Sequence, residues 1–255
     1  MSYLIELNRH IRYENLQGFD SSGLLFGIEV DHFRDDMTDY FLSSPHLDLE
    51  ETEDIPHKAE ALGILINGIF EIFEIPEFLQ LRSHRLLRKE NLQFIANVSI
   101  HPPSREFLMP YSGLYREWPT WKRSAHQYLE GEKGNFCILC LLDDRIRNIA
   151  LTLGYLGINW ISLSSIMEHL GYSESEMARR YEVDLGDIKL LKRTANSFEV
   201  LGPAARHGQK GFEPPKEPMR LIKAKEITLK MIRIEAILKS KEAPFKQFVG
   251  QTFCG

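Results

Sequence analysis

Short aliphatic runs separated by turn-forming residues dominate the first hundred positions of the chain. Residues 3–7 and 24–30 are rich in aliphatic side chains, and a glycine- and serine-rich stretch lies between them, which predicts two strands. Residues 91–100 predict a further strand, which a pair of prolines ends. The acidic segment after Val30 has no clear period, so we expect an exposed connection there.

A helix is predicted between these strands. Residues 52–54 offer capping oxygens, Pro56 suits a first helical position, and Pro76 ends the pattern. Apolar side chains spaced three and four apart predict one buried face: Ala59, Leu62, Ile66, Ile69 and Phe73.

From Asn135 onward the apolar positions follow a helical period almost to the end of the chain. A first helix is closed by glycines, and a second begins at Trp160 and closes at Gly171. The stripe of the first helix consists of Ile138, Leu142, Ile146, Ile149 and Leu153.

Three further helices are predicted in this half. The residues 173–176 have the pattern of a capping box, and either Asp184 or Asp187 caps the next helix, which runs towards Asn196. The last helix spans about residues 219–240, with its lysines away from the apolar side.

The predicted fold class is therefore α+β. We expect a mixed strand-and-helix module over residues 1–130 and a mainly helical bundle over residues 131–255. Residues 199–218 are dense in glycine and proline and predict a long loop without regular structure.

Composition narrows the function classes. The chain has 255 residues, of which 43% are hydrophobic and 26% are charged, and its apolar runs meet charges too soon to span a membrane. Three cysteines make no disulfide framework and the first residues do not resemble a leader, so we expect a cytoplasmic protein. The motifs of nucleotide hydrolases, dinucleotide-binding folds, serine hydrolases and zincins are not found, and no cofactor is expected.

Charge is distributed unevenly along the chain. Residues 31–60 hold ten acidic and two basic side chains, a local charge of −8, whereas residues 209–246 hold ten basic and five acidic ones, a local charge of +5. The basic end is able to attract a polyanion such as RNA, or it is a solvated helix face that pairs with the acidic stretch.

Four polar residues around the long loop are the main candidates for chemistry. Arg193 and Asn196 end one predicted helix, and Arg206 and His207 lie in the loop. Guanidinium groups bind phosphate, and an imidazole transfers protons near neutral pH, so together these residues suit a phosphodiester site. Alternatively, Asn196 caps the helix end, and Arg206 and His207 hold the loop through backbone carbonyls.

Other motifs have simpler structural interpretations. Cys137 and Cys140 form a C-x-x-C pattern in an apolar context, which predicts buried thiols rather than a metal site. His57 and Glu60 lie three apart and predict a surface pair at the start of a helix. Arg147 is followed by Asn148, but without the histidine that a nuclease motif of this kind would need.

The segments Arg193-Thr-Ala-Asn-Ser, Ala205-Arg-His-Gly and Glu213-Pro-Pro-Lys-Glu-Pro-Met resemble the C-terminal signature of a group of uncharacterised bacterial proteins. A more distant similarity is to HEPN helical bundles, including the Apea-like branch. That resemblance implies a homodimer and a metal-independent ribonuclease in a toxin or defence setting. HEPN motifs place arginine and histidine about four to six residues apart, whereas Arg193 and His207 are further apart and Arg206 is adjacent to His207.

Two hypotheses follow. In the first, the protein binds or cleaves RNA: His207 transfers protons while the RNA 2′-hydroxyl attacks the adjacent phosphate, Arg206 or Arg193 stabilises the phosphoryl charge, and Asn196 orients the reacting groups. In the second, the chain is a non-enzymatic module that binds another protein through the acidic stretch 31–60 or the basic last helix. The first hypothesis requires Asn196, Arg206 and His207 to share an open pocket.

Overall fold

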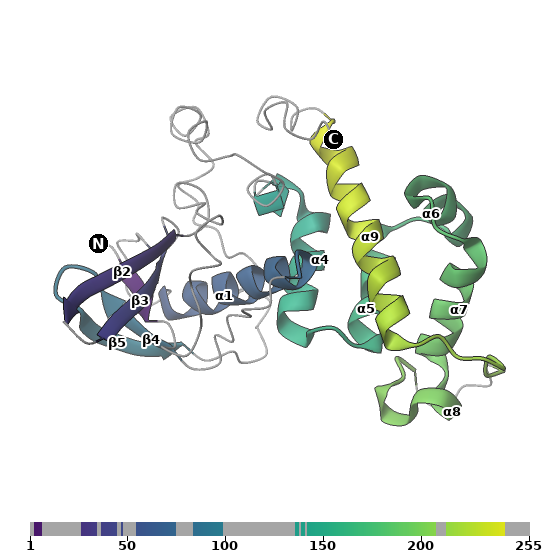
Figure 1. The fold of residues 1–255 in the computed structure, drawn as a ribbon, viewed down its shortest axis with the longest axis horizontal. Coiled ribbons are helices and arrows are strands. Elements are labelled where there is room, and N and C mark those ends of the chain that lie inside the picture. Colours follow the sequence, from purple (N-terminus) through teal and green to yellow (C-terminus); the bar gives the residue numbers. More distant parts are fainter. Residues whose placement is uncertain are drawn as a thin grey trace. The chain divides into compact units, whose positions relative to one another are not determined.

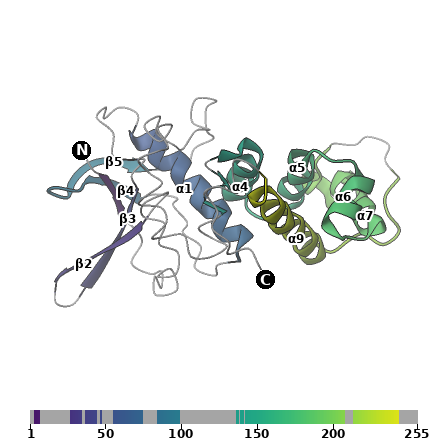
Figure 2. The ribbon, with the colours of Figure 1, turned by 90° about the horizontal axis from the view of Figure 1, so that it is seen from above.

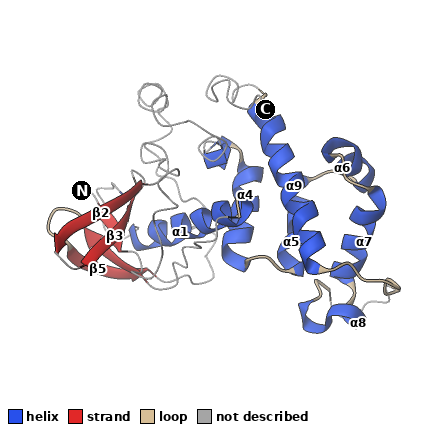
Figure 3. Cartoon of the chain, in the orientation of Figure 1, coloured by secondary structure: helices blue, strands red, loops and turns tan. Residues whose placement is uncertain are grey.

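A computed structural model describes residues 3–6, 27–34, 37–44, 47, 55–74, 84–98, 136–137, 139–140, 142–207 and 213–242. The fold is α+β, as predicted, with an antiparallel sheet and helices (Figure 3). By its internal packing the chain divides into a first unit, Met1–Tyr155 with Ser240–Gly255, and a second unit, Leu156–Lys239.

The sheet of the first unit has five strands in the order β2-β3-β1-β4-β5, and every neighbouring pair is antiparallel (Figure 1). In the central strand, Ile5 pairs with Leu42 on one side and with Leu86 on the other. The strands are β1 (Tyr3–Glu6), β2 (Gly27–Arg34), β3 (Met37–Ser43), β4 (His84–Arg88) and β5 (Gln93–Val98). Leu4, Phe41 and Leu87 form a buried cluster that joins three of these strands.

The strands predicted near the N-terminus and at residues 91–100 are confirmed as β1, β2 and β5, with shifted bounds. The exposed connection predicted after Val30 is wrong, because β2 continues to Arg34 and pairs with β3, with Arg34 opposite Met37. Strand β4 was not predicted. Charged residues interrupt the apolar alternation in the segments of β3 and β4. Backbone pairing with a neighbouring strand does not depend on that alternation.

The helix predicted between the strands is confirmed as α1 (Ile55–Ile72), which contacts β5 (Figure 2). Its apolar surface is not confined to one face, since even Glu60 and Asn67 are buried. A second helix, α4 (Asp144–Leu156), packs very closely against α1. A Cβ atom added at Gly68 would lie 1.7 Å from the carbonyl oxygen of Ala150, and one added at Gly154 would lie 1.7 Å from that of Ile64.

This close packing explains why the observed division of the chain differs from the predicted one. The prediction began the helical module at residue 131, which lies outside the described residues, and placed the helix with the apolar stripe from Ile138 to Leu153 in that module. The structure groups α4 with the first unit up to Tyr155, because α4 buries its apolar side against α1.

The second unit is built from helices whose ends follow local capping rules. They are α5 (Trp160–Leu170), α6 (Glu174–Tyr181), α7 (Leu185–Asn196), α8 (Phe198–Leu201), η5 (Gly202–Ala204) and α9 (Leu221–Ser240). The predicted capping box is confirmed: Glu176 N donates to Ser173 Oγ at 3.3 Å, and Ser173 N donates to Glu176 Oε2 at 2.9 Å. Of the two candidate caps for α7, Asp184 accepts from the backbone of Asp187.

A buried carboxylate joins α6 to α9 inside the second unit. Glu235 is fully buried and accepts from Arg180 Nε at 2.7 Å, from the Tyr181 hydroxyl at 3.1 Å and from the Tyr172 hydroxyl at 3.5 Å. Arg180 also stacks on Tyr172, with 4.7 Å between its guanidinium carbon and the ring centroid. Burial and the adjacent carboxylate raise the pKa of the Tyr181 hydroxyl well above its ordinary value.

The predicted loop over residues 199–218 is only partly irregular. It contains the end of α8 and the short helix η5, which Gly202 and Pro203 begin, before the chain enters residues 208–212 outside the described part. The glycine and proline content alone does not reveal the backbone hydrogen bonds that form such short helices. Within the described helices, none is both long enough and apolar enough to span a membrane.

Candidate functional site

Helix α7 has one polar face and one buried face. Ile188, Leu191 and Ala195 are buried in the second unit, as is Thr194. The opposite positions carry polar side chains at the spacing i, i+3, i+4 and i+7, which places them on one side of the helix: Lys189, Lys192, Arg193 and Asn196.

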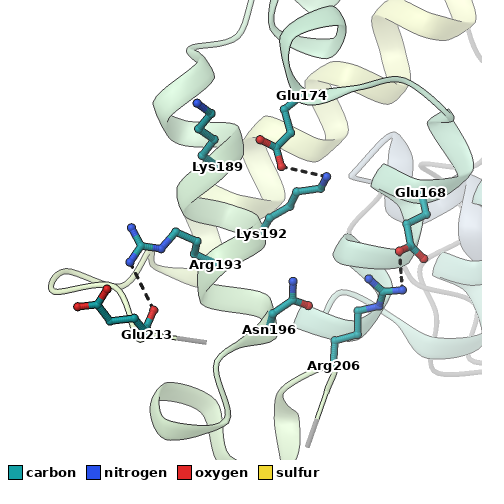
Figure 4. Close-up of a pocket in the computed structure, with 8 residues that line it drawn as sticks. All are labelled: Glu168, Glu174, Lys189, Lys192, Arg193, Asn196, Arg206 and Glu213. Atoms are coloured by element: carbon teal, nitrogen blue, oxygen red, sulfur yellow. Dashed lines mark hydrogen bonds and ion pairs between the residues drawn. The ribbon is translucent and has the colours of Figure 1, made fainter. Parts of the chain in front are cut away.

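This polar face borders a pocket of about 660 Å³ within the second unit (Figure 4). The other walls come from α5, from the start of α6 and from the two ends of the 207–213 connection. The lining residues are Glu168, Glu174, Lys189, Lys192, Arg193, Asn196, Arg206 and Glu213. The pocket is therefore polar, with four cationic and three carboxylate side chains.

Two of the cations form ion pairs with carboxylates of the same pocket. Arg206 Nη2 lies 2.5 Å from Glu168 Oε1, and Lys192 Nζ lies 3.1 Å from Glu174 Oε1. All four side chains are partly exposed, so solvent screens both pairs. A ligand can therefore reach and reorganise these pairs at a modest cost in free energy.

The other two cations, Lys189 and Arg193, have no carboxylate partner among the described side chains. Arg193 Nη2 donates to the backbone carbonyl of Glu213 at 3.4 Å, and Figure 4 shows its guanidinium at the edge of the pocket. Among the residues with described side chains, neither Lys189 nor Arg193 forms an ion pair with a carboxylate. These two side chains supply the positive charge that is available to a ligand.

Asn196 is the last residue of α7 and lines the pocket beside Arg206. Its Oδ1 atom is buried and has no hydrogen-bond partner in the described part of the chain. The alternative role as a helix cap is not observed, because the C-cap is Ser197 and the Ala195 carbonyl accepts from the Arg206 backbone at 2.9 Å. The Asn196 carboxamide keeps hydrogen-bonding capacity beside the cations.

Two hydrogen bonds from backbone amides hold the chain around the pocket. The Arg206 amide donates to the Ala195 carbonyl, and the Met219 amide donates to the buried hydroxyl of Thr194 at 3.1 Å. Both acceptors lie in the last turn of α7. The segments before and after residues 208–212 are therefore anchored to the same helix end.

The structure brings together three of the four predicted site residues. Arg193, Asn196 and Arg206 line the pocket, whereas His207, which is half-buried, is not among the lining residues. The Arg206 side chain pairs with the Glu168 carboxylate. This differs from the alternative prediction, in which Arg206 holds the loop through backbone carbonyls.

The prediction missed Lys189 and Lys192 and all three carboxylates of the pocket. The helical spacing of the two lysines with Arg193 was a signal that sequence alone offered. Glu168, Glu174 and Glu213 come from other elements, and their approach to α7 depends on how the helices pack.

The remaining candidates lie in the first unit. Cys137 and Cys140 are buried, as predicted, and burial together with the neighbouring Cys137 raises the pKa of the Cys140 thiol. His57 Nδ1 lies 4.0 Å from Glu60 Oε2, but Glu60 is mostly buried, so this pair is not wholly at the surface. Arg147 is buried and donates to the Cys140 carbonyl at 3.3 Å.

No group of three or more histidine, cysteine, aspartate or glutamate side chains suited to a metal ion occurs in the described parts of either unit. Comparison of the chain with protein-family models, curated proteins and solved structures found no match. The resemblance to HEPN bundles therefore stays a prediction.

Proposed function

We propose that the second unit binds RNA through the pocket beside α7. The observation that supports this proposal is that Lys189 and Arg193, two cations without a carboxylate partner among the described side chains, line the same pocket of about 660 Å³ as Arg206. Charge-assisted hydrogen bonds from arginine and lysine are the usual contacts to phosphate groups.

The other polar group of the pocket also suits a nucleotide. Asn196 also lines the pocket, and although its Oδ1 atom is buried, the amide nitrogen of a carboxamide donates hydrogen bonds. A nucleotide presents phosphate oxygens next to sugar hydroxyls and base edges. The more distant similarity of this chain to HEPN bundles favours RNA among the polyanions.

Binding has more support than cleavage. A metal-independent cleavage needs a group that transfers protons at the bound phosphate. His207, the predicted group, follows Arg206 in the chain but does not line the pocket. We therefore propose an RNA-binding function, and cleavage is an outcome that substitution of His207 would reveal.

A protein partner on the last helix has less support, because basic side chains of α9 are already engaged. Lys223 Nζ lies 2.5 Å from Asp187 Oδ1, and Lys230 Nζ donates to the Glu182 carbonyl at 2.7 Å. In the acidic stretch 31–60, the side chains of residues 31–40 lie outside the described ones. That interaction hypothesis stays a prediction.

The test is binding of a fluorescently labelled single-stranded RNA, measured by anisotropy at low salt with a chelator present. The double variant Lys189→Ala/Arg193→Ala should bind roughly tenfold or more weakly, and the slope of log affinity against log salt should fall by about one for each phosphate that the variant no longer binds. The matched control is Lys216→Ala, which removes an exposed positive charge outside the pocket lining.

Equal affinities of the wild type and the double variant would contradict the proposed site. The same conclusion follows if Lys216→Ala weakens binding as much as a single pocket substitution, since binding would then depend only on total charge. An RNA that does not bind to the wild type or to any variant would contradict the function itself.

A further inference from the structure

Glu168 occupies the position on Arg206 that an anionic ligand would take. The two side chains come from the last turn of α5 and from the segment after η5, and their charged atoms are 2.5 Å apart. Figure 4 shows this pair on one side of the pocket and Arg193 on the other, with Asn196 between them. A phosphate that binds the Nη2 group of Arg206 must therefore compete with a carboxylate.

Resting on the proposed RNA binding, we propose that Glu168 makes the pocket select the phosphorylated end of an RNA chain, a phosphomonoester, over internal phosphodiesters. Glu168 is a specificity-determining residue in this proposal. Its carboxylate pairs with Arg206 until a ligand of higher negative charge replaces that carboxylate.

The charges of the two kinds of phosphate support this selection. An internal phosphodiester carries one negative charge, and a phosphomonoester carries about −1.5 to −2 at neutral pH. A monoanion has no advantage over the Glu168 carboxylate in competing for Arg206. A phosphomonoester has such an advantage, because its additional negative charge strengthens its attraction to the Arg206 guanidinium, and Lys189 and Arg193 add positive charge to the same pocket.

The size of the pocket points to the end of a chain. Its volume of about 660 Å³ lies within the range of pockets that enclose most of a small ligand. A terminal nucleotide fits such a volume, with its phosphate at Arg206. Asn196, whose Oδ1 atom is buried, then offers its amide nitrogen to the sugar or the base.

The experiment compares one short single-stranded RNA sequence with a 5′-phosphate, with a 3′-phosphate, or with hydroxyls at both ends, by titration calorimetry at neutral pH. The wild type should bind at least one phosphorylated form roughly three- to tenfold more tightly than the hydroxyl form. Glu168→Gln should tighten binding of the hydroxyl form about three- to fivefold and bring the ratio of affinities towards one.

Two controls separate this role from a general change of charge. In a protein that already carries Arg206→Ala, Glu168→Gln should change neither the affinity for phosphorylated RNA nor that for the hydroxyl form, because Glu168 acts through Arg206. Glu199→Gln removes the same charge from an exposed position outside the lining and should leave the ratio unchanged.

The possible failures can be distinguished. Equal binding of all three RNA forms by the wild type, or a ratio that Glu168→Gln leaves unchanged, would overturn the selection while RNA binding stands. No binding of any form by the wild type or by Glu168→Gln would overturn the proposed function as well. Uridine 5′-monophosphate that binds as tightly as phosphorylated RNA would support the phosphomonoester site and contradict RNA as its ligand.

Discussion

At the scale of single residues, His207 separates RNA binding from RNA cleavage. It does not line the pocket, so His207→Ala should leave the affinity for RNA within about twofold of the wild type, because every side chain proposed to bind phosphate is still present. Anisotropy with the same labelled RNA measures this affinity. The extent of cleavage in the presence of a chelator is read from a gel of the same samples.

A large decrease in the affinity of His207→Ala, with circular dichroism showing an intact fold, would place this histidine in the binding site after all. Cleavage by the wild type that His207→Ala abolishes would restore the predicted catalytic role. Arg193→Ala serves as the comparison, because Arg193 lines the pocket and its removal should weaken binding.

Glu235 is the residue on which the packing of α6 against α9 depends most. Replacing it with alanine leaves the Arg180 guanidinium and the Tyr181 hydroxyl without this acceptor; Tyr181 is fully buried and Arg180 is partly exposed. We expect Glu235→Ala to lower the free energy of unfolding by about 3 kcal/mol, measured by urea denaturation.

The control for Glu235→Ala is Glu226→Ala, an exposed position on the same helix, which should change the free energy of unfolding by less than about 0.5 kcal/mol. If both variants lower the free energy of unfolding by similar small amounts, the hydrogen bonds of Glu235 contribute little to stability.

At the scale of elements, the close approach of α1 and α4 depends on glycine. Alanine normally stabilises a helix relative to glycine by up to about 1 kcal/mol, but here the added Cβ would overlap a carbonyl oxygen of the facing helix. Gly68→Ala and Gly154→Ala should therefore each destabilise the protein, by about 2 kcal/mol or more, in thermal or urea unfolding.

Gly157→Ala is the matched comparison. Gly157 has a φ of 67°, but a Cβ atom there would meet nothing within 4 Å, so its substitution costs only the backbone strain of about 1 kcal/mol. If Gly154→Ala is no more destabilising than Gly157→Ala, the two helices adjust without penalty and their close approach is not required.

The elements that sequence predicted best are those whose ends are set by neighbouring residues. Ser173 and Glu176 satisfy each other's backbone within one turn, and Asp184 does the same for α7. Strands β3 and β4 were missed because the pairing that stabilises them involves residues far away in the chain. The local signal was correspondingly weak for both.

At the scale of the whole chain, the division into two units depends on tertiary packing. The apolar stripe of α4 was visible as a helical period, but nothing in that period shows whether its partner is α1 or a helix of the second unit. In the structure α4 belongs to the first unit, and the predicted start of the helical module differs for that reason.

The amino-acid sequence by itself determined the α+β class, the cap of α6 and three of the pocket residues, since these depend on periodicity and on chemistry within a few residues. The tertiary structure decided which charges meet. Glu168, Arg206 and α7 are brought together by helix packing, and His207 is not among the lining residues although it is adjacent to Arg206 in the chain. Proximity in sequence does not fix where a side chain points, because direction depends on the backbone conformation that packing selects.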